Sequence, residues 1–155
     1  MFATFAAPMP ASAEQITAAA FVQQAAISDM FEKESSELAA IRSDLPTRRF
    51  AATMNTDHQK SSSELFMAVK PHFDTTPIPP RMDAEHQQMI VQLQKLYGAA
   101  FTTKYHADQV AAHEAAVKFF NAYAQTGSNI KLKAFAVKML PTLRAHLRMA
   151  RALTE

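Results

Sequence analysis

The chain has 155 residues, of which 48% are hydrophobic, two are glycine and none is cysteine. Its 16 basic and 14 acidic residues leave a formal net charge of +2, which is too small to indicate nucleic-acid binding. Without cysteine, disulfides and thiolate metal sites are excluded, and no apolar run reaches the ~18 residues that a transmembrane helix needs.

The first thirteen residues, MFATFAAPMPASA, are apolar, small and uncharged. Ala11-Ser12-Ala13 is typical of a signal-peptidase cleavage site, although a basic region is missing and the apolar part is short. Two interpretations stay open: a secretory signal peptide truncated by a start codon placed too far downstream, which indicates export, and an ordinary disordered tail. A chain of this length builds one core, so we expect a single domain over 14–155.

Two helices are predicted in the first half of the chain. Residues 14–42 carry apolar side chains three, four and seven positions apart, which is the pattern of an amphipathic helix. Pro46 suits the first turn of a second helix that runs to about His72. Because the connection between them is short, these two helices should be antiparallel neighbours.

The second half begins with an irregular segment, FDTTPIPPRMD, and continues as three helices. Asp83 is a suitable N-cap for a short helix that ends near Leu96, and a long helix follows over 99–126. Gly127 ends that helix, and Ser128 or Asn129 caps the last one, which runs to about 152. Four long helices, two short hairpin turns and one long middle connection predict an all-α, ferritin-like four-helix bundle with a short extra helix in the crossover.

Charge is unevenly distributed between the ends of the chain. Residues 13–44 carry six acidic and two basic residues, whereas 129–152 carry six basic residues and no acid. The first and last helices could lie side by side with opposite charges, or these residues could form two solvated faces.

Each long helix carries one glutamate or histidine in its presumed inner stripe. These residues are Glu34, His58, His113 and His146. Within each hairpin the pair is offset by only ~4 residues, or ~6 Å along the axis, so the four side chains could converge on one ion. A glutamate with three histidines suits Zn, Fe or Cu, with Asp57, Asp108 and Glu114 as neighbours able to orient the imidazoles.

Several alternatives to this metal site stay open. The Glu-x-x-His pair of di-iron bundles is missing, which argues against a di-iron oxidase. Met30, Met54 and Met149 lie one helical turn from candidate ligands and would suit copper, although methionine at this spacing is also ordinary core filler. The polar residues could instead form a hydrogen-bonded cluster without metal.

Pro141 stands in the middle of the last helix, about one turn before His146. It removes a backbone hydrogen bond and should kink the helix, so it could direct the histidine into the core or simply shape the packing.

Five segments in order resemble the bacterial family called domain of unknown function 4142. They are FVQQAAISDMFEKESSELA, RRFAATMNTDHQKSSSEL, MDAEHQQMIVQL, FTTKYHADQVAAHEAAVKFF and LKAFAVKMLPTLRAHLRMA. The resemblance covers nearly the whole chain after residue 20 and includes Asp57-His58, His113 and Leu140-Pro141 with His146-Leu147. It implies a ferritin-like bundle that is usually exported, as a periplasmic or outer-membrane protein, and it implies no reaction.

Together these observations predict an exported helical bundle that binds a metal ion in its core. The alternative is a structural or envelope-stress interaction protein whose buried cluster holds the helices in register. No phosphate-binding loop or nucleophile elbow points to an enzyme. Partners could be an envelope protein or further copies of the chain.

Overall fold

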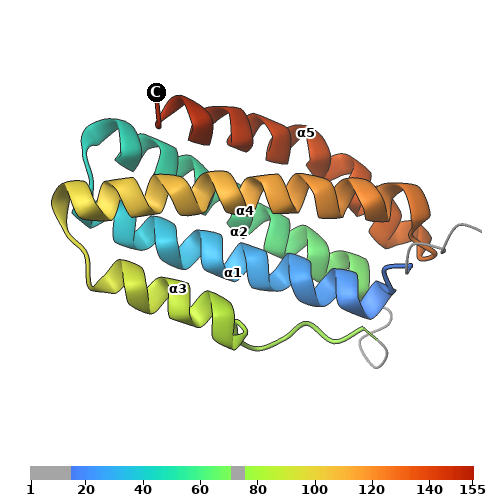
Figure 1. The fold of residues 1–155 in the computed structure, drawn as a ribbon. Coiled ribbons are helices and arrows are strands. Elements are labelled where there is room, and N and C mark those ends of the chain that lie inside the picture. The colour runs from blue at the N-terminus through green and yellow to red at the C-terminus, as the bar shows by residue number, and fades with distance from the viewer. Residues whose placement is uncertain (1–14, 71–75) are drawn as a thin grey trace, which may run out of the picture.

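The computed structural model describes residues 15–70 and 76–155, and its regular structure there is entirely helical (Figure 1). The helices are α1 (Ala18–Arg42), α2 (Leu45–Val69), α3 (Ala84–Gln94), α4 (Gly98–Thr126) and α5 (Ile130–Ala152). The expected all-α bundle with a short helix in its crossover is confirmed. The proposed signal peptide or tail, 1–13, lies outside the described residues.

Side-chain caps explain where most helices begin. The Asp83 and Asn129 side chains accept hydrogen bonds from backbone amides in the first turns of α3 and α5, as the sequence predicted. The Asp44 carboxylate does the same at the start of α2, with Pro46 in the first turn. α1 begins later than the apolar pattern suggested because the Thr17 hydroxyl caps it.

Two glycines make the turns around α4 feasible. Gly98, the first residue of α4, has a φ of +55°. Residues other than glycine adopt this backbone conformation only with strain. Gly127 ends α4, and a Cβ atom there would lie 2.6 Å from the Tyr123 carbonyl oxygen. The predicted stop at Gly127 is therefore confirmed, with a steric reason.

The four long helices form two antiparallel hairpins packed against each other. α1 pairs with α2 and α4 pairs with α5, while α1 also packs on α4 and α2 on α5. In Figure 1, α3 lies on the outer side of α1, where the crossover returns along the bundle. α1 and α5 occupy diagonal corners, so the suggestion that opposite charges bring the first and last helices side by side was wrong.

The bundle core consists of two apolar clusters with a polar layer between them. One cluster centres on Phe21, whose ring stacks on Tyr123 with centroids 4.0 Å apart. The other contains Met54, Phe101 and Tyr105. Along α2, α4 and α5 the buried histidines lie between residues of the first cluster and residues of the second, which places them near the middle of the bundle.

α5 continues as one helix through Pro141, whose side chain is exposed. None of the helices in the described part of the chain is both long and apolar enough to cross a membrane.

Candidate metal centre

Three histidines from three helices meet in the polar layer. His58 of α2, His113 of α4 and His146 of α5 are each at least 97% buried. Their ring centroids are 5.3 to 5.7 Å apart. One nitrogen of each ring lies within 4.8 Å of a nitrogen of each of the other two. The rings therefore form a compact triangle across the bundle.

One nitrogen of each imidazole is engaged by an acceptor outside the triangle. His58 Nδ1 lies 2.7 Å from an Asp29 oxygen, and His146 Nε2 lies 2.9 Å from an Asp57 oxygen. His113 Nδ1 lies 2.9 Å from the Gln109 carbonyl oxygen, one turn earlier in α4. Because a carbonyl or carboxylate accepts, these three nitrogens carry the protons, and the proton-free nitrogen of each ring is the other one.

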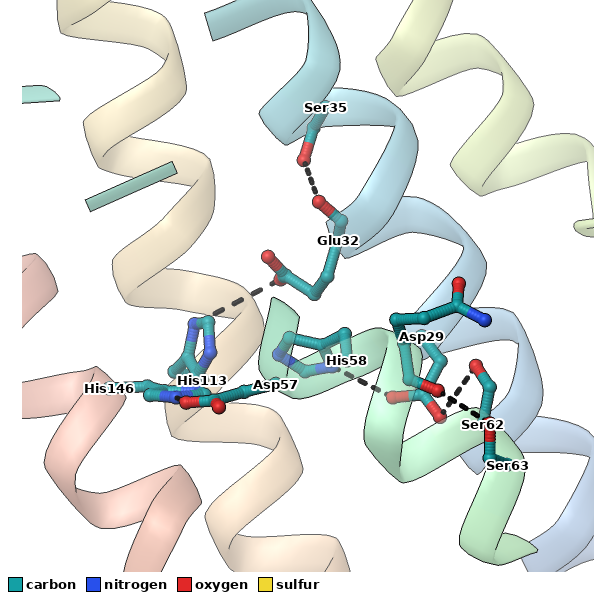
Figure 2. Close-up of polar contacts among 10 residues, drawn as sticks. Asp29, Glu32, Ser35, Asp57, His58, Ser62, Ser63, His113 and His146 are labelled. Carbon is teal, nitrogen blue, oxygen red and sulfur yellow. Dashed lines mark hydrogen bonds and ion pairs between the residues drawn. The ribbon is translucent and has the colours of Figure 1, made fainter. Parts of the chain in front are cut away.

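The three remaining nitrogens are His58 Nε2, His113 Nε2 and His146 Nδ1. All three are buried and have no hydrogen-bond partner among the described residues. Figure 2 shows the three rings gathered together, with Asp29 and Asp57 beside them. Three buried lone pairs that share one small space form an unfavourable arrangement unless an electron-pair acceptor lies among them.

Burial and neighbouring charges move the pKa values of two of these histidines in opposite directions. Burial lowers the pKa of His58, but the hydrogen bond to Asp29 and the charges of Glu32, Asp29 and Asp57 outweigh it and raise the net value. Burial lowers the pKa of His146 to about 4, against a partial opposing effect of Asp57. Without a metal ion, the cluster therefore takes up a proton at His58 before His146.

α1 contributes carboxylates to this layer, but not from the position that the sequence suggested. Asp29 and Glu32 are the buried acids of α1, at 4% and 1% exposure. Glu32 Oε1 lies 3.9 Å from His113 Nδ1 (Figure 2). Glu34, the expected fourth ligand, is half-buried and lines a surface groove with Met30. Two residues along a helix turn a side chain by ~200°, so Glu34 faces away from the face that carries Glu32.

Of the three acids expected to orient imidazoles, the structure places one against a histidine. Asp57 accepts the hydrogen bond from His146 and is itself partly exposed, so His146 adjoins solvent through it. Asp108 is paired instead with Lys104, whose Nζ lies 2.7 Å from its Oδ2. Glu114 is exposed and pairs with Arg151 at 2.6 Å.

The methionines of the copper interpretation occupy different environments. Met54 is fully buried in an apolar cluster with Phe50 and Tyr105. Met149 is 38% exposed. Of the three methionines, Met54 alone is buried, because Met30 lines the surface groove beside Glu34.

The chain belongs to the family described as Domain of unknown function (DUF4142), whose model matches residues 3–153. No curated protein matches the sequence. A solved structure, CopM in the Cu(II)-bound form, is similar with a TM-score of 0.73 over 89% of this chain and 95% of that chain. The two are 14% identical, so the likeness shows a shared fold.

Proposed function

We propose that this member of the DUF4142 family binds one transition-metal ion among His58, His113 and His146, with copper as the first candidate. The observation that carries the proposal is a set of three buried imidazole nitrogens without partners, on three histidines that each offer a nitrogen within 4.8 Å of the other two. The outer hydrogen bonds leave each of these nitrogens with a free lone pair, which is the form that a metal ion requires.

The donor set fits such an ion chemically. Neutral imidazole suits Zn, Cu and Fe, and each ring is oriented by an outer acceptor, as is usual for histidines that ligate metals. Bonds of about 2.0 to 2.1 Å place three nitrogens ~3.5 Å apart in a trigonal arrangement. Nitrogens of the three rings lie within 4.8 Å of one another, so reaching that spacing would require them to approach by at most ~1.3 Å.

Copper is the first metal to test because CopM, which shares this fold, binds Cu(II) in its solved form. Zinc and iron are tested beside it, since the imidazoles accept all three. Because the three histidines are almost completely buried, the ion would be held away from water. That favours holding and transfer of the ion over turnover of a substrate, and the half-exposed Asp57 marks the side on which the site adjoins solvent.

The test is metal content and affinity in protein purified without a histidine tag. We expect about one equivalent of metal in the wild type and none in His113→Ala or in the pair His58→Ala/His146→Ala. His86→Gln is the matched control, because His86 is a partly buried histidine that pairs with Asp83 outside the cluster. A wild type that takes up no copper, zinc or iron after reconstitution would refute the proposal and leave a structural polar layer.

We further propose that this function operates outside the cytoplasm. The apolar first thirteen residues with Ala11-Ser12-Ala13, and the family resemblance, support export. Fractionation of cells that express the protein from its natural gene tests this. Protein confined to the cytoplasm would refute export and leave the metal proposal untouched.

A further inference from the structure

Glu32 is a buried carboxylate whose surroundings offer it no hydrogen bond. It is 1% exposed, and neither Oε1 nor Oε2 has a hydrogen-bond partner among the described residues. His113 Nδ1 is the nearest base, 3.9 Å from Oε1, but its proton is directed to the Gln109 carbonyl oxygen at 2.9 Å. This separates Glu32 from Asp29 and Asp57, which each accept a hydrogen bond from a histidine.

The polar groups near Glu32 are engaged with other partners. The Ser35 hydroxyl donates to the backbone carbonyl of Glu32, not to its carboxylate, and Gln109 Nε2 donates to Ser35 Oγ. The Ser36 and Tyr105 hydroxyls are hydrogen-bonded to each other. The donors named here are therefore directed to acceptors other than the Glu32 carboxylate, which is left without a hydrogen bond, as is the acceptor oxygen Oε1 of Gln109.

A buried carboxylate without hydrogen bonds is stabilised by a cation close to it. The three-histidine site adjoins Glu32, because its ligand His113 is also the neighbour of Glu32. A metal ion among the imidazoles would bring a positive charge into a region where Coulomb interactions are weakly screened. Neutral imidazoles contribute no charge to such a site, so the carboxylates around it determine its net charge.

We propose that Glu32 determines the charge preference of this site, so that it favours divalent Cu(II) and Zn(II) over monovalent Cu(I). The inference rests on the metal-binding function proposed above. A nearby negative charge stabilises a doubly charged ion about twice as much as a singly charged one at the same place. Carboxylate oxygen is also a hard donor, which matches the divalent ions better than Cu(I).

The experiment compares Glu32→Gln with Glu34→Gln, two residues away on the outer side of α1. Affinities for Cu(II) and Zn(II) are measured by competition with chelators, and affinity for Cu(I) by a Cu(I)-specific chelator under anaerobic, reducing conditions. We expect Glu32→Gln to weaken Cu(II) and Zn(II) binding by roughly 10- to 100-fold and Cu(I) binding by clearly less. Glu34→Gln should leave all three affinities unchanged.

A second readout requires no metal. Because Glu32→Gln removes an unpaired buried carboxylate, the metal-free variant should be at least as stable to urea as the metal-free wild type. Glu32→Leu, which removes the polar group without adding a sulfur ligand, should behave alike in both assays and provides the test if Glu32→Gln fails to fold.

The outcomes separate the two proposals. The role assigned to Glu32 is refuted, and the metal site stands, if the wild type binds Cu(II) but Glu32→Gln and Glu32→Leu weaken Cu(I) and Cu(II) binding equally or weaken neither. If the wild type binds none of the three ions, the metal site is refuted and this inference falls with it.

Discussion

Acid should destabilise the metal-free protein through His146. Burial lowers the pKa of this histidine to about 4, whereas in an unfolded chain it has its ordinary value of 6.5. Between those two values the unfolded chain binds a proton that the folded chain does not. The free energy of unfolding contributed by His146 is therefore fully present above pH 6.5 and is lost as the pH falls toward 4.

The magnitude follows from the difference between the two pKa values. One unit corresponds to about 1.4 kcal/mol, so His146 accounts for a loss of about 2.5 kcal/mol between about pH 7 and about pH 4.5. His58 acts in another range, because its pKa is raised in the folded protein. Its contribution is fully present below 6.5 and is lost as the pH rises through the folded value, so it stays nearly constant over the acid range in which His146 titrates.

The assay is urea unfolding followed by circular dichroism in the presence of a chelator, at about pH 7 and about pH 4.5. Carboxylates also titrate in this range, so the informative quantity is the difference between variants. His146→Gln removes the titrating ring and keeps an N–H group for Asp57. With an m-value of about 2 kcal/mol per M, the acid shift of the unfolding midpoint should be ~1 M smaller in His146→Gln than in the wild type.

His86→Gln is the control, because it removes a histidine outside the cluster. We expect it to keep the acid shift of the wild type. An equal acid shift in wild type and His146→Gln would refute the reasoning, since it would mean that burial of His146 does not oppose its protonation.

Three further predictions concern the second layer of the site and the backbone. Asp29→Asn should weaken metal binding by roughly 10- to 100-fold in chelator competition, because Asp29 fixes the proton of His58 at Nδ1. Glu114→Gln, which changes an exposed acid, should leave metal binding unchanged. Equal affinities for both variants would contradict the role of Asp29. Pro141→Ala should stabilise the protein by about 1 to 3 kcal/mol in urea unfolding, because it restores a helix hydrogen bond at an exposed site. A loss of stability would show that the packing depends on proline. Gly98→Ala should lower stability by about 1 kcal/mol and the melting temperature by roughly 2 to 4 °C. The cause is the positive φ, because an added Cβ atom would meet no neighbour within 4 Å. An unchanged melting temperature would contradict this.

The three histidines were identifiable from sequence because their helices follow a simple rule. In α5 the buried row advances in alternating steps of four and three residues, through Leu132, Ala136, Met139, Leu143, His146 and Ala150. Apolar residues on either side of His146 reveal the inner face of the helix. The same reasoning places His58 between Met54 and Leu65 in α2.

The acids of α1 were missed because its buried row is not apolar. That row has the same alternating steps, through Val22, Ala25, Asp29, Glu32, Ser36 and Ala39, but most of its members are small or polar. Ile41, an apolar residue two helical turns after Glu34, is 72% exposed. The apolar stripe therefore pointed to Glu34. The regular spacing of small residues around Asp29 and Glu32 was the signal that could have found them.

The sequence by itself determined the helices, most of their ends and the inward position of the three histidines, because caps, glycines and apolar periodicity act within a few residues of each other. Only the tertiary structure decided which face of α1 turns inward and which nitrogen of His58 and of His146 is free. Those features depend on groups from other helices: His58 is oriented by Asp29 of α1, and His146 by Asp57 of α2. Local sequence cannot encode such contacts, since they exist only once the two hairpins have packed together.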